Sequence, residues 1–197
     1  MATTDLKAVY VAKYEYDSES KLVTYTEGRR IGGAVNHNMT PTSGKAALYA
    51  DGAEAITANY TTGGTLTHAI ADLTDEDKAF ITGIEAVPMQ INGKQVNVYA
   101  ETDEIQPPYL GYGTVRVGMD VSNNVWYQPI IYPKIKYGVV AESYTTKGET
   151  ITITAESLTA SVLKEDIDGK WRITAERQRS LEAAIEVVEK FLGEKSS

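Results

Sequence analysis

Hydrophobic and polar residues alternate along most of this chain, and a period of two is the pattern of a strand with one buried face. The alternation is clear in the stretch LKAVYVAKY at 6–14. The polar residues at 17–21 predict a turn, and the residues around Leu22 and Tyr25 predict a return strand, so we expect the chain to open with a hairpin. Further strands are predicted over 65–73, 96–100, 109–121, 125–136 and 149–162.

Two prolines interrupt the strand predicted at 125–136. Pro129 and Pro133 each remove a backbone donor, which predicts an edge or a bulge at that strand. The pair Asn123-Asn124 just before it can adopt the positive φ angles of a tight hairpin turn.

A short helix is predicted directly after the strand at 65–73. The hydroxyl of Thr74 can cap it by accepting from the N–H of Asp77, acidic residues occupy its first turn, and Gly83 ends it. Because a helix of little more than two turns is marginal by itself, we expect Phe80 and Ile84 to hold it by packing against the sheet.

A second helix is predicted over 180–192. Its apolar residues recur at the spacing of one helical face, and Gly193 follows the last of them. The residues of that face are Leu181, Ala184, Ile185, Val188 and Leu192.

The alternating pattern weakens between Gly32 and Gly64, most of all in the stretch NHNMTPTSGK. The sequence therefore predicts a long loop at about 36–50 within a single domain that spans 1–197. Loops longer than about 12 to 15 residues are uncommon in compact domains and are often functional.

Composition supports a sheet protein and narrows the function. Thirteen Tyr against two Phe, with many Thr and Val, is typical of strands, and the absence of Cys excludes disulfides and thiolate sites. A net charge of −8 argues against a surface that binds nucleic acid, since such binding depends on Lys and Arg. No basic and apolar leader and no long apolar run is present, so we expect a soluble chain made in a cytoplasm and no membrane partner.

No motif indicates catalysis, a metal or another cofactor. His37 and His68 have no nearby ligand residues in the sequence, and we expect structural or surface roles for them. The DIDGK stretch at 166–170 lacks the later Glu of a calcium loop and is interpreted as a turn. Gly111-x-Gly113 is followed by strand residues and not by a helix, which excludes a phosphate-binding loop.

Two long blocks of the sequence resemble one known family. The block ALYADGAEAITANYTTGGTLTHAIADLTDEDKAFITG runs from Ala47 to Gly83, and the second block runs from Tyr109 to Leu163 and includes GYGTVRVG and ESYTTKGE. Together with the start YVAKYEYDSESKLVTY they are similar to the major tail proteins of long-tailed, non-contractile bacteriophages. No single motif is unique to that family, and the shared order of the segments carries the resemblance.

The resemblance implies a β-sandwich or barrel-like core with a short flanking helix and a C-terminal helix. It also implies a structural virion protein that forms hexameric rings, which stack as the tail tube through which DNA passes during ejection. The expected partners are other copies of the chain and the tape measure, tail terminator and distal tail proteins. The expected location is the virion tail.

Two sets of residues are candidates for roles in such a tube. The loop is expected to contact a neighbouring ring through Asn36, His37, Asn38, Met39, Thr40, Pro41, Gly44, Lys45 and Tyr49. Carboxylates that face the lumen are expected to repel the duplex, and the candidates are Asp120, Glu149 and Glu156.

Two other functions remain open at this point. The many tyrosines would suit a β-sandwich adhesion or carbohydrate-binding module, because aromatic faces stack on sugars. A small hydrolase built from scattered carboxylates would require a deep pocket with paired Asp or Glu residues of shifted pKa.

Overall fold

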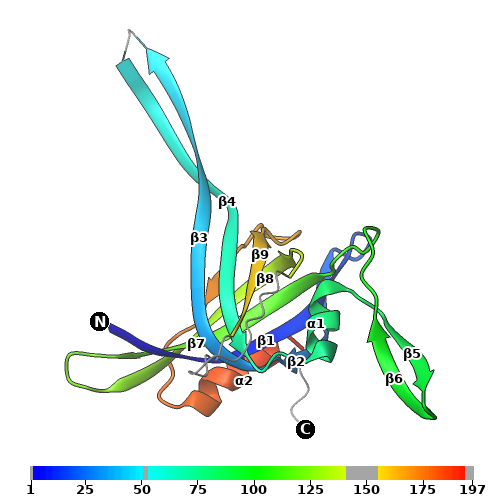
Figure 1. Cartoon of the computed structure of the whole chain (residues 1–197). Coiled ribbons are helices and arrows are strands. Elements are labelled where there is room, and N and C mark those ends of the chain that lie inside the picture. Colours follow the sequence, from blue (N-terminus) through cyan, green and yellow to red (C-terminus); the bar gives the residue numbers. More distant parts are fainter. Residues whose placement is uncertain (1, 51–52, 141–154, 194–197) are drawn as a thin grey trace, which may run out of the picture.

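The computed structural model describes residues 2–50, 53–140 and 155–193, and the fold is mainly β (Figure 1). Eight strands form one curved sheet in the order β2-β1-β7-β8-β9-β4-β3, with β10 paired to β8. Their bounds are β1 Ala2–Asp17, β2 Leu22–Arg30, β3 Gly33–Ala50, β4 Ala53–Ala71, β7 Tyr109–Met119, β8 Val125–Tyr137, β9 Glu156–Leu163 and β10 Ile173–Thr174. All paired strands are antiparallel.

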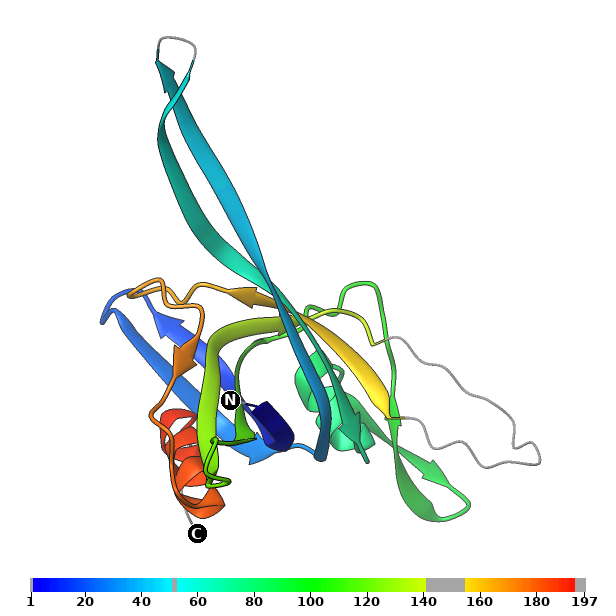
Figure 2. The ribbon, with the colours of Figure 1, turned by 90° about the vertical axis from the view of Figure 1, so that its left-hand side faces the viewer.

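Two hydrophobic cores lie on opposite sides of this sheet, each covered by one helix (Figure 2). Inside the curve, side chains such as Leu66 and Ile135 pack with Ile81 of α1 (Asp75–Thr82). On the outer side, β1, β7 and β8 pack against α2 (Leu181–Phe191) through residues such as Val188. The predicted barrel-like fold with a flanking helix and a C-terminal helix is confirmed.

Strand β7 is buried on both faces, and this explains its glycines. A Cβ atom at Gly113 would overlap Val188 of α2, and one at Gly111 would overlap Leu192 and the ring of Tyr25. The two glycines therefore allow α2 to lie close to the sheet.

The prediction of a loop at about 36–50 is wrong, because this segment is strand β3. It pairs with β4 from Gly33 opposite Ala71 to Ala50 opposite Ala53, and the two strands form a long hairpin that projects from the body (Figure 1). Pro41 and Gly44 suggested a loop because both disfavour strands. Within the hairpin, Gly44 is covered by the ring of Tyr60 on the opposite strand.

Both helices follow the sequence prediction closely. The Thr74 hydroxyl accepts from the N–H of Asp77 at 3.1 Å, and Gly83 ends α1 in a left-handed conformation. Ser180 caps α2 in the same manner by accepting from Ala183. Phe80 is partly buried against the core and Ile84 is buried, as predicted, but the fully buried residue of α1 is Ile81, which was not predicted.

The remaining strands agree in part. The β7–β8 register shifts opposite Pro133, which confirms a bulge there, and Asn123 adopts a positive φ of 63° in the preceding turn. A separate hairpin of β5 (Ala86–Ile91) and β6 (Lys94–Tyr99) was predicted only in its second strand. The first part of the strand predicted at 149–162 lies outside the described residues. No helix in the described part of the chain is long and apolar enough to span a membrane.

Candidate functional site

The outer part of the β3–β4 hairpin has two edges without a strand partner among the described residues. Strand β4 pairs with β9 only from Gly64 to Ile70, so both strands leave the sheet beyond Gly63. An unpaired strand edge presents a row of N–H and C=O groups that can pair with another chain. The projecting part is therefore a candidate assembly surface.

Two glycines mark the point where the hairpin leaves the body. Gly63 has a φ of 144°, and a Cβ atom there would overlap the carbonyl oxygen of Val162 at the end of β9. At Gly64 a Cβ atom would overlap Met39 and the carbonyl oxygen of Thr40 on β3. The paired glycines of the sequence thus permit three strands to approach closely at this exit.

His37 fixes the base of the hairpin to the body. Its Nδ1 lies 3.2 Å from the Tyr112 hydroxyl of β7, and its Nε2 lies 3.1 Å from the Tyr132 hydroxyl of β8. Burial lowers the pKa of His37 to about 4, with a smaller contribution from the charge of Arg172. A neutral His37 can donate from one nitrogen and accept at the other, so both contacts can be hydrogen bonds.

His68 lies deeper in the same core. It is fully buried, and its Nε2 lies 2.9 Å from the hydroxyl of Tyr137. Burial lowers its pKa to about 3, and the nearby His37 adds to the effect. The structural roles expected for both histidines are confirmed, but their tyrosine partners could not be identified from the sequence because they lie 69 or more residues away.

Eight of the nine residues proposed as a contact loop fall into three groups. His37 and Met39 face the core and belong to the body of the fold. Asn36, Asn38 and Thr40 lie on the opposite face of the same part of β3, which pairs with the body through β4. Pro41, Gly44 and Lys45 lie at the start of the projecting part and along it, and the side chain of Tyr49 lies outside the described residues.

The outward face of β3, β4 and β9 carries uncharged polar residues. Asn38, Thr67 and Thr159 form one row across the three strands. The neighbouring rows are Thr40, Thr65 and Ser161, then Asn36, Ala69 and Ser157. We call these nine residues the hydroxyl face; eight of them are uncharged polar residues, and the ninth, Ala69, is buried. The alternation of Thr and Ser at 65–67 and 157–161 is the signal by which the sequence could have shown it.

The three candidate lumen carboxylates do not lie together on this face. Glu156 lies on the other side of β9, the side that carries the buried Leu158 and Ala160. Asp120 follows β7, and its carboxylate accepts from the side-chain amide of Asn124 and from the backbone N–H groups of Asn124 and Ser122, which lowers its pKa. Glu149 lies outside the described residues.

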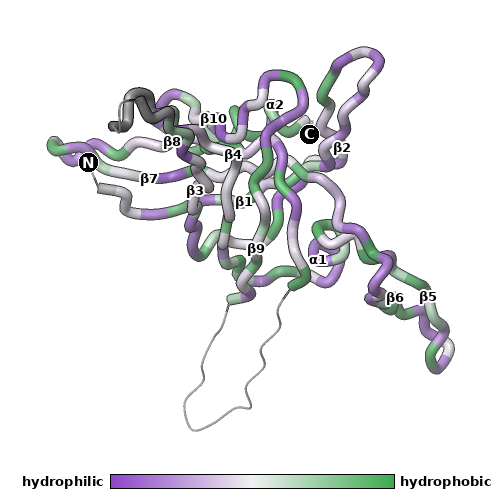
Figure 3. The backbone as a smooth tube through the Cα atoms, turned by 90° about the horizontal axis from the view of Figure 1, so that it is seen from above, coloured by the Kyte–Doolittle hydropathy of each residue, from purple (hydrophilic) through white to green (hydrophobic). Residues whose placement is uncertain are grey.

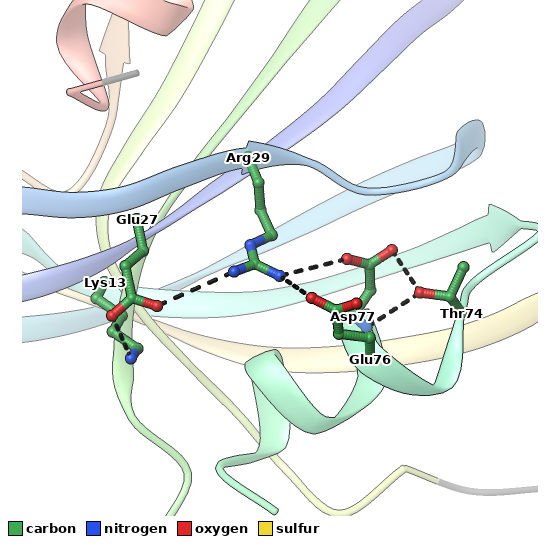
Figure 4. Close-up of polar contacts among 6 residues, drawn as sticks. All are labelled: Lys13, Glu27, Arg29, Thr74, Glu76 and Asp77. Carbon is green, nitrogen blue, oxygen red and sulfur yellow. Dashed lines mark hydrogen bonds and ion pairs between the residues drawn. The ribbon is translucent and has the colours of Figure 1, made fainter. Parts of the chain in front are cut away.

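A network of charged residues fixes α1 to the sheet (Figure 4). The Arg29 guanidinium of β2 lies 3.2 Å from Glu76 and 4.2 Å from the centre of the Phe80 ring. Beside it, Lys13 contacts Glu27 at 2.6 Å. The helix predicted to close the sheet is thus held by an ion pair and a cation–π contact at its rim and by Ile81 within.

The described residues show little that resembles a hydrolytic centre. No group of three or more His, Cys, Asp or Glu residues there could hold a metal ion. Among the carboxyl groups that the structure describes, each one with a shifted pKa is shifted down, because hydrogen bonds or cations stabilise its charged form; these are Asp5, Asp17, Asp120, Asp166 and Glu186. A general acid would instead need a raised pKa.

No protein-family model matches the chain, and no curated protein sequence is significantly similar to it.

Proposed function

We propose that the chain is the subunit of a phage tail tube, built from stacked hexameric rings through which DNA passes. The resemblance described above suggests this function, and the projecting β3–β4 hairpin is the observation that supports it most directly. Beyond the body, β3 runs from Thr42 to Ala50, which at about 3.3 Å per residue is on the order of 30 Å. A projection of that length can reach a neighbouring subunit or ring.

The composition of the hairpin also suits a contact between copies. The described side chains at 41–47 and 57–62 are exposed or half-exposed, and none belongs to either core. They add nothing to either core of the subunit, yet they pair across the hairpin without a register shift from Ser43 opposite Thr61 to Ala47 opposite Thr57. A long ordered element without a core is explained if its unpaired edges bind another subunit.

The hydroxyl face supports a channel wall. Helix α2 covers the outer side of β1, β7 and β8, whereas the hydroxyl face of β3, β4 and β9 is largely exposed. Its Ser, Thr and Asn side chains carry no positive charge that would bind passing phosphates. We therefore propose an uncharged channel wall, and the chain's excess of carboxylates lies on other surfaces of the subunit.

A carbohydrate-binding module is less well supported. Such a module needs several open aromatic faces side by side, but the exposed tyrosines Tyr16, Tyr60 and Tyr109 lie on three different strands, and Trp126 is only 8% exposed. The guanidinium groups of Arg116 and Arg177 lie 5.4 and 4.3 Å from its ring centre. This tryptophan is therefore not available for stacking on a sugar.

Shortening the hairpin tests the proposal. Residues 43–62 would be replaced by an Asn-Gly turn that joins Thr42 to Gly63, which face each other across the hairpin. Because the described side chains among the deleted residues belong to neither core, we expect cooperative unfolding with unchanged stability, and loss of tubes seen by negative-stain electron microscopy. Tubes formed by the shortened chain would contradict the role given to the hairpin.

A further inference from the structure

Two of the six arginines of this acidic chain lie against one tryptophan, and a third lines the same groove. Arg116 and Arg177 lie against the ring of Trp126, and Arg179 follows two residues after Arg177. The backbone of Gln178 pairs with Tyr127 of β8, so the segment between the two arginines is extended and their side chains leave on the same side.

Arg177 and Arg179 line an open groove with the β7–β8 turn. Both are exposed. Asp120 also lines this groove, but the turn occupies its carboxylate through the N–H groups of Ser122 and Asn124. We call Arg116, Arg177 and Arg179 the arginine end.

Exposed carboxylates gather around α1 and the loop between β6 and β7. They are Asp72, Asp75, Glu85, Glu101, Asp103 and Glu104, which we call the acidic end. Asp75 and Glu101 line the same pocket, together with Lys78. The carboxylates outnumber the lysine, so this surface is negative.

The two charged surfaces lie at opposite ends of the molecule. Figures 1 and 3 both show the β7–β8 turn at the left extremity and α1 with the β5–β6 hairpin at the right. The β3–β4 hairpin leaves the body between them, at a steep angle to the line that joins the two ends (Figure 1).

Each end also exposes apolar side chains. At the arginine end Val121 is 97% exposed and Val125 44%. At the acidic end, Val87, Met89 and Val96 of the β5–β6 hairpin are each 43 to 52% exposed, and Met89 faces Val96 across its strands. Each end thus combines charge with apolar surface that a partner could cover.

We propose that the arginine end of one copy binds the acidic end of the next. The proposal rests on the proposed function in taking the partner to be this same chain. Guanidinium groups form paired hydrogen bonds with carboxylates, and opposite charge selects this contact over like ends meeting. Because the two surfaces differ and lie at opposite ends, the contact is head-to-tail, which generates a closed ring or a filament and not an isolated symmetric dimer.

Charge reversal at each end tests the contact. One variant carries Arg177→Glu and Arg179→Glu, and the other carries Asp103→Arg and Glu104→Arg in the β6–β7 loop. We expect each variant alone to self-associate roughly tenfold or more weakly than the natural chain in sedimentation velocity, because like charges then face each other. An equimolar mixture should recover association. The glutamates at 177 and 179 of the first variant then meet the arginines at 103 and 104 of the second, and the unchanged arginine end of the second meets the unchanged acidic end of the first.

Two further chains serve as controls. Lys164→Glu with Lys190→Glu makes the same change in net charge as the double arginine variant, on exposed residues that follow β9 and lie in α2, and it should associate like the natural chain. A chain with all four reversals has the charges of its two ends exchanged, so the ends attract each other again and the chain should self-associate. Circular dichroism and urea unfolding would show that each variant is folded.

The outcomes separate this inference from the proposed function. Reversal variants that assemble like the natural chain, or a mixture no stronger than its components, would overturn the head-to-tail contact even if tubes form. Recovery in the mixture, without tubes from the natural chain under electron microscopy, would support the contact and count against the tail tube.

Discussion

Acid should destabilise this protein well before its carboxylates begin to titrate, and the cause is the pair of buried histidines. The native pKa is about 4 for His37 and about 3 for His68, against an ordinary value of 6.5. Below pH 6.5 the two histidines are protonated in the unfolded chain but stay neutral in the native protein. The free energy of unfolding is therefore highest above pH 6.5 and falls as the pH decreases toward the native pKa values.

The size of the effect follows from the two pKa shifts. Between its unfolded and native pKa values, each histidine lowers the free energy of unfolding by about 1.4 kcal/mol per pH unit. At pH 5 each has therefore removed about 2 kcal/mol, and the pair about 4 kcal/mol. This is a large part of a typical stability of about 5 to 15 kcal/mol. Carboxylates such as Asp166, whose native pKa is lowered below 3.8, add their loss mainly at lower pH.

Urea unfolding at pH 7.5 and pH 5.0 measures the effect. We expect the loss of unfolding free energy between the two pH values to shrink by about 2 kcal/mol in His68→Gln and similarly in His37→Gln, whatever each substitution does to stability at pH 7.5. Thr67→Ala, on the neighbouring position without a titrating group, should keep the full loss. Equal pH dependence in all four proteins would refute the reasoning.

Three further predictions concern particular contacts. Thr74→Ala should reduce stability by about 1 kcal/mol in urea unfolding while Thr74→Ser does not, because the cap of α1 needs the hydroxyl; equal stability would mean that packing of Ile81 alone decides this helix. Gly113→Ala should cost about 1 to 3 kcal/mol through overlap with Val188, and adding Val188→Ala should recover part of it; strictly additive losses would show that the two do not touch. Thr67→Cys, in a chain that has no other cysteine, should react in assembled tubes with a small maleimide but not with a maleimide attached to a large polymer. A cysteine on the outer face of α2 should react with both reagents. Equal reaction of the two cysteines with the large reagent would mean that the hydroxyl face does not line the channel.

Local signals predicted much of this fold. The spacing of apolar residues in α2 identified its buried face, and Thr74 and Gly83 gave both ends of α1 to the residue. These features depend on residues that are close together in the sequence, so the local sequence is enough to predict them. The β1–β2 hairpin was predicted for the same reason.

Features that depend on distant partners were missed. Pro41 and Gly44 suggested a loop because the projecting part of β3 carries no clear hydrophobic alternation, and a segment that packs against no core needs none. The role of His37 depends on Tyr112 and Tyr132, which the sheet brings to it from other strands. The gathering of Arg116, from β7, with Arg177 around Trp126 likewise becomes visible only in the folded chain.

Negative-stain electron microscopy of the purified chain at increasing concentration tests the central proposal most directly. The account predicts hollow tubes with a regular axial repeat and six-fold rings in end views, formed by the natural chain but not by the chain with the shortened hairpin. Single globular particles at every concentration and salt condition would contradict it.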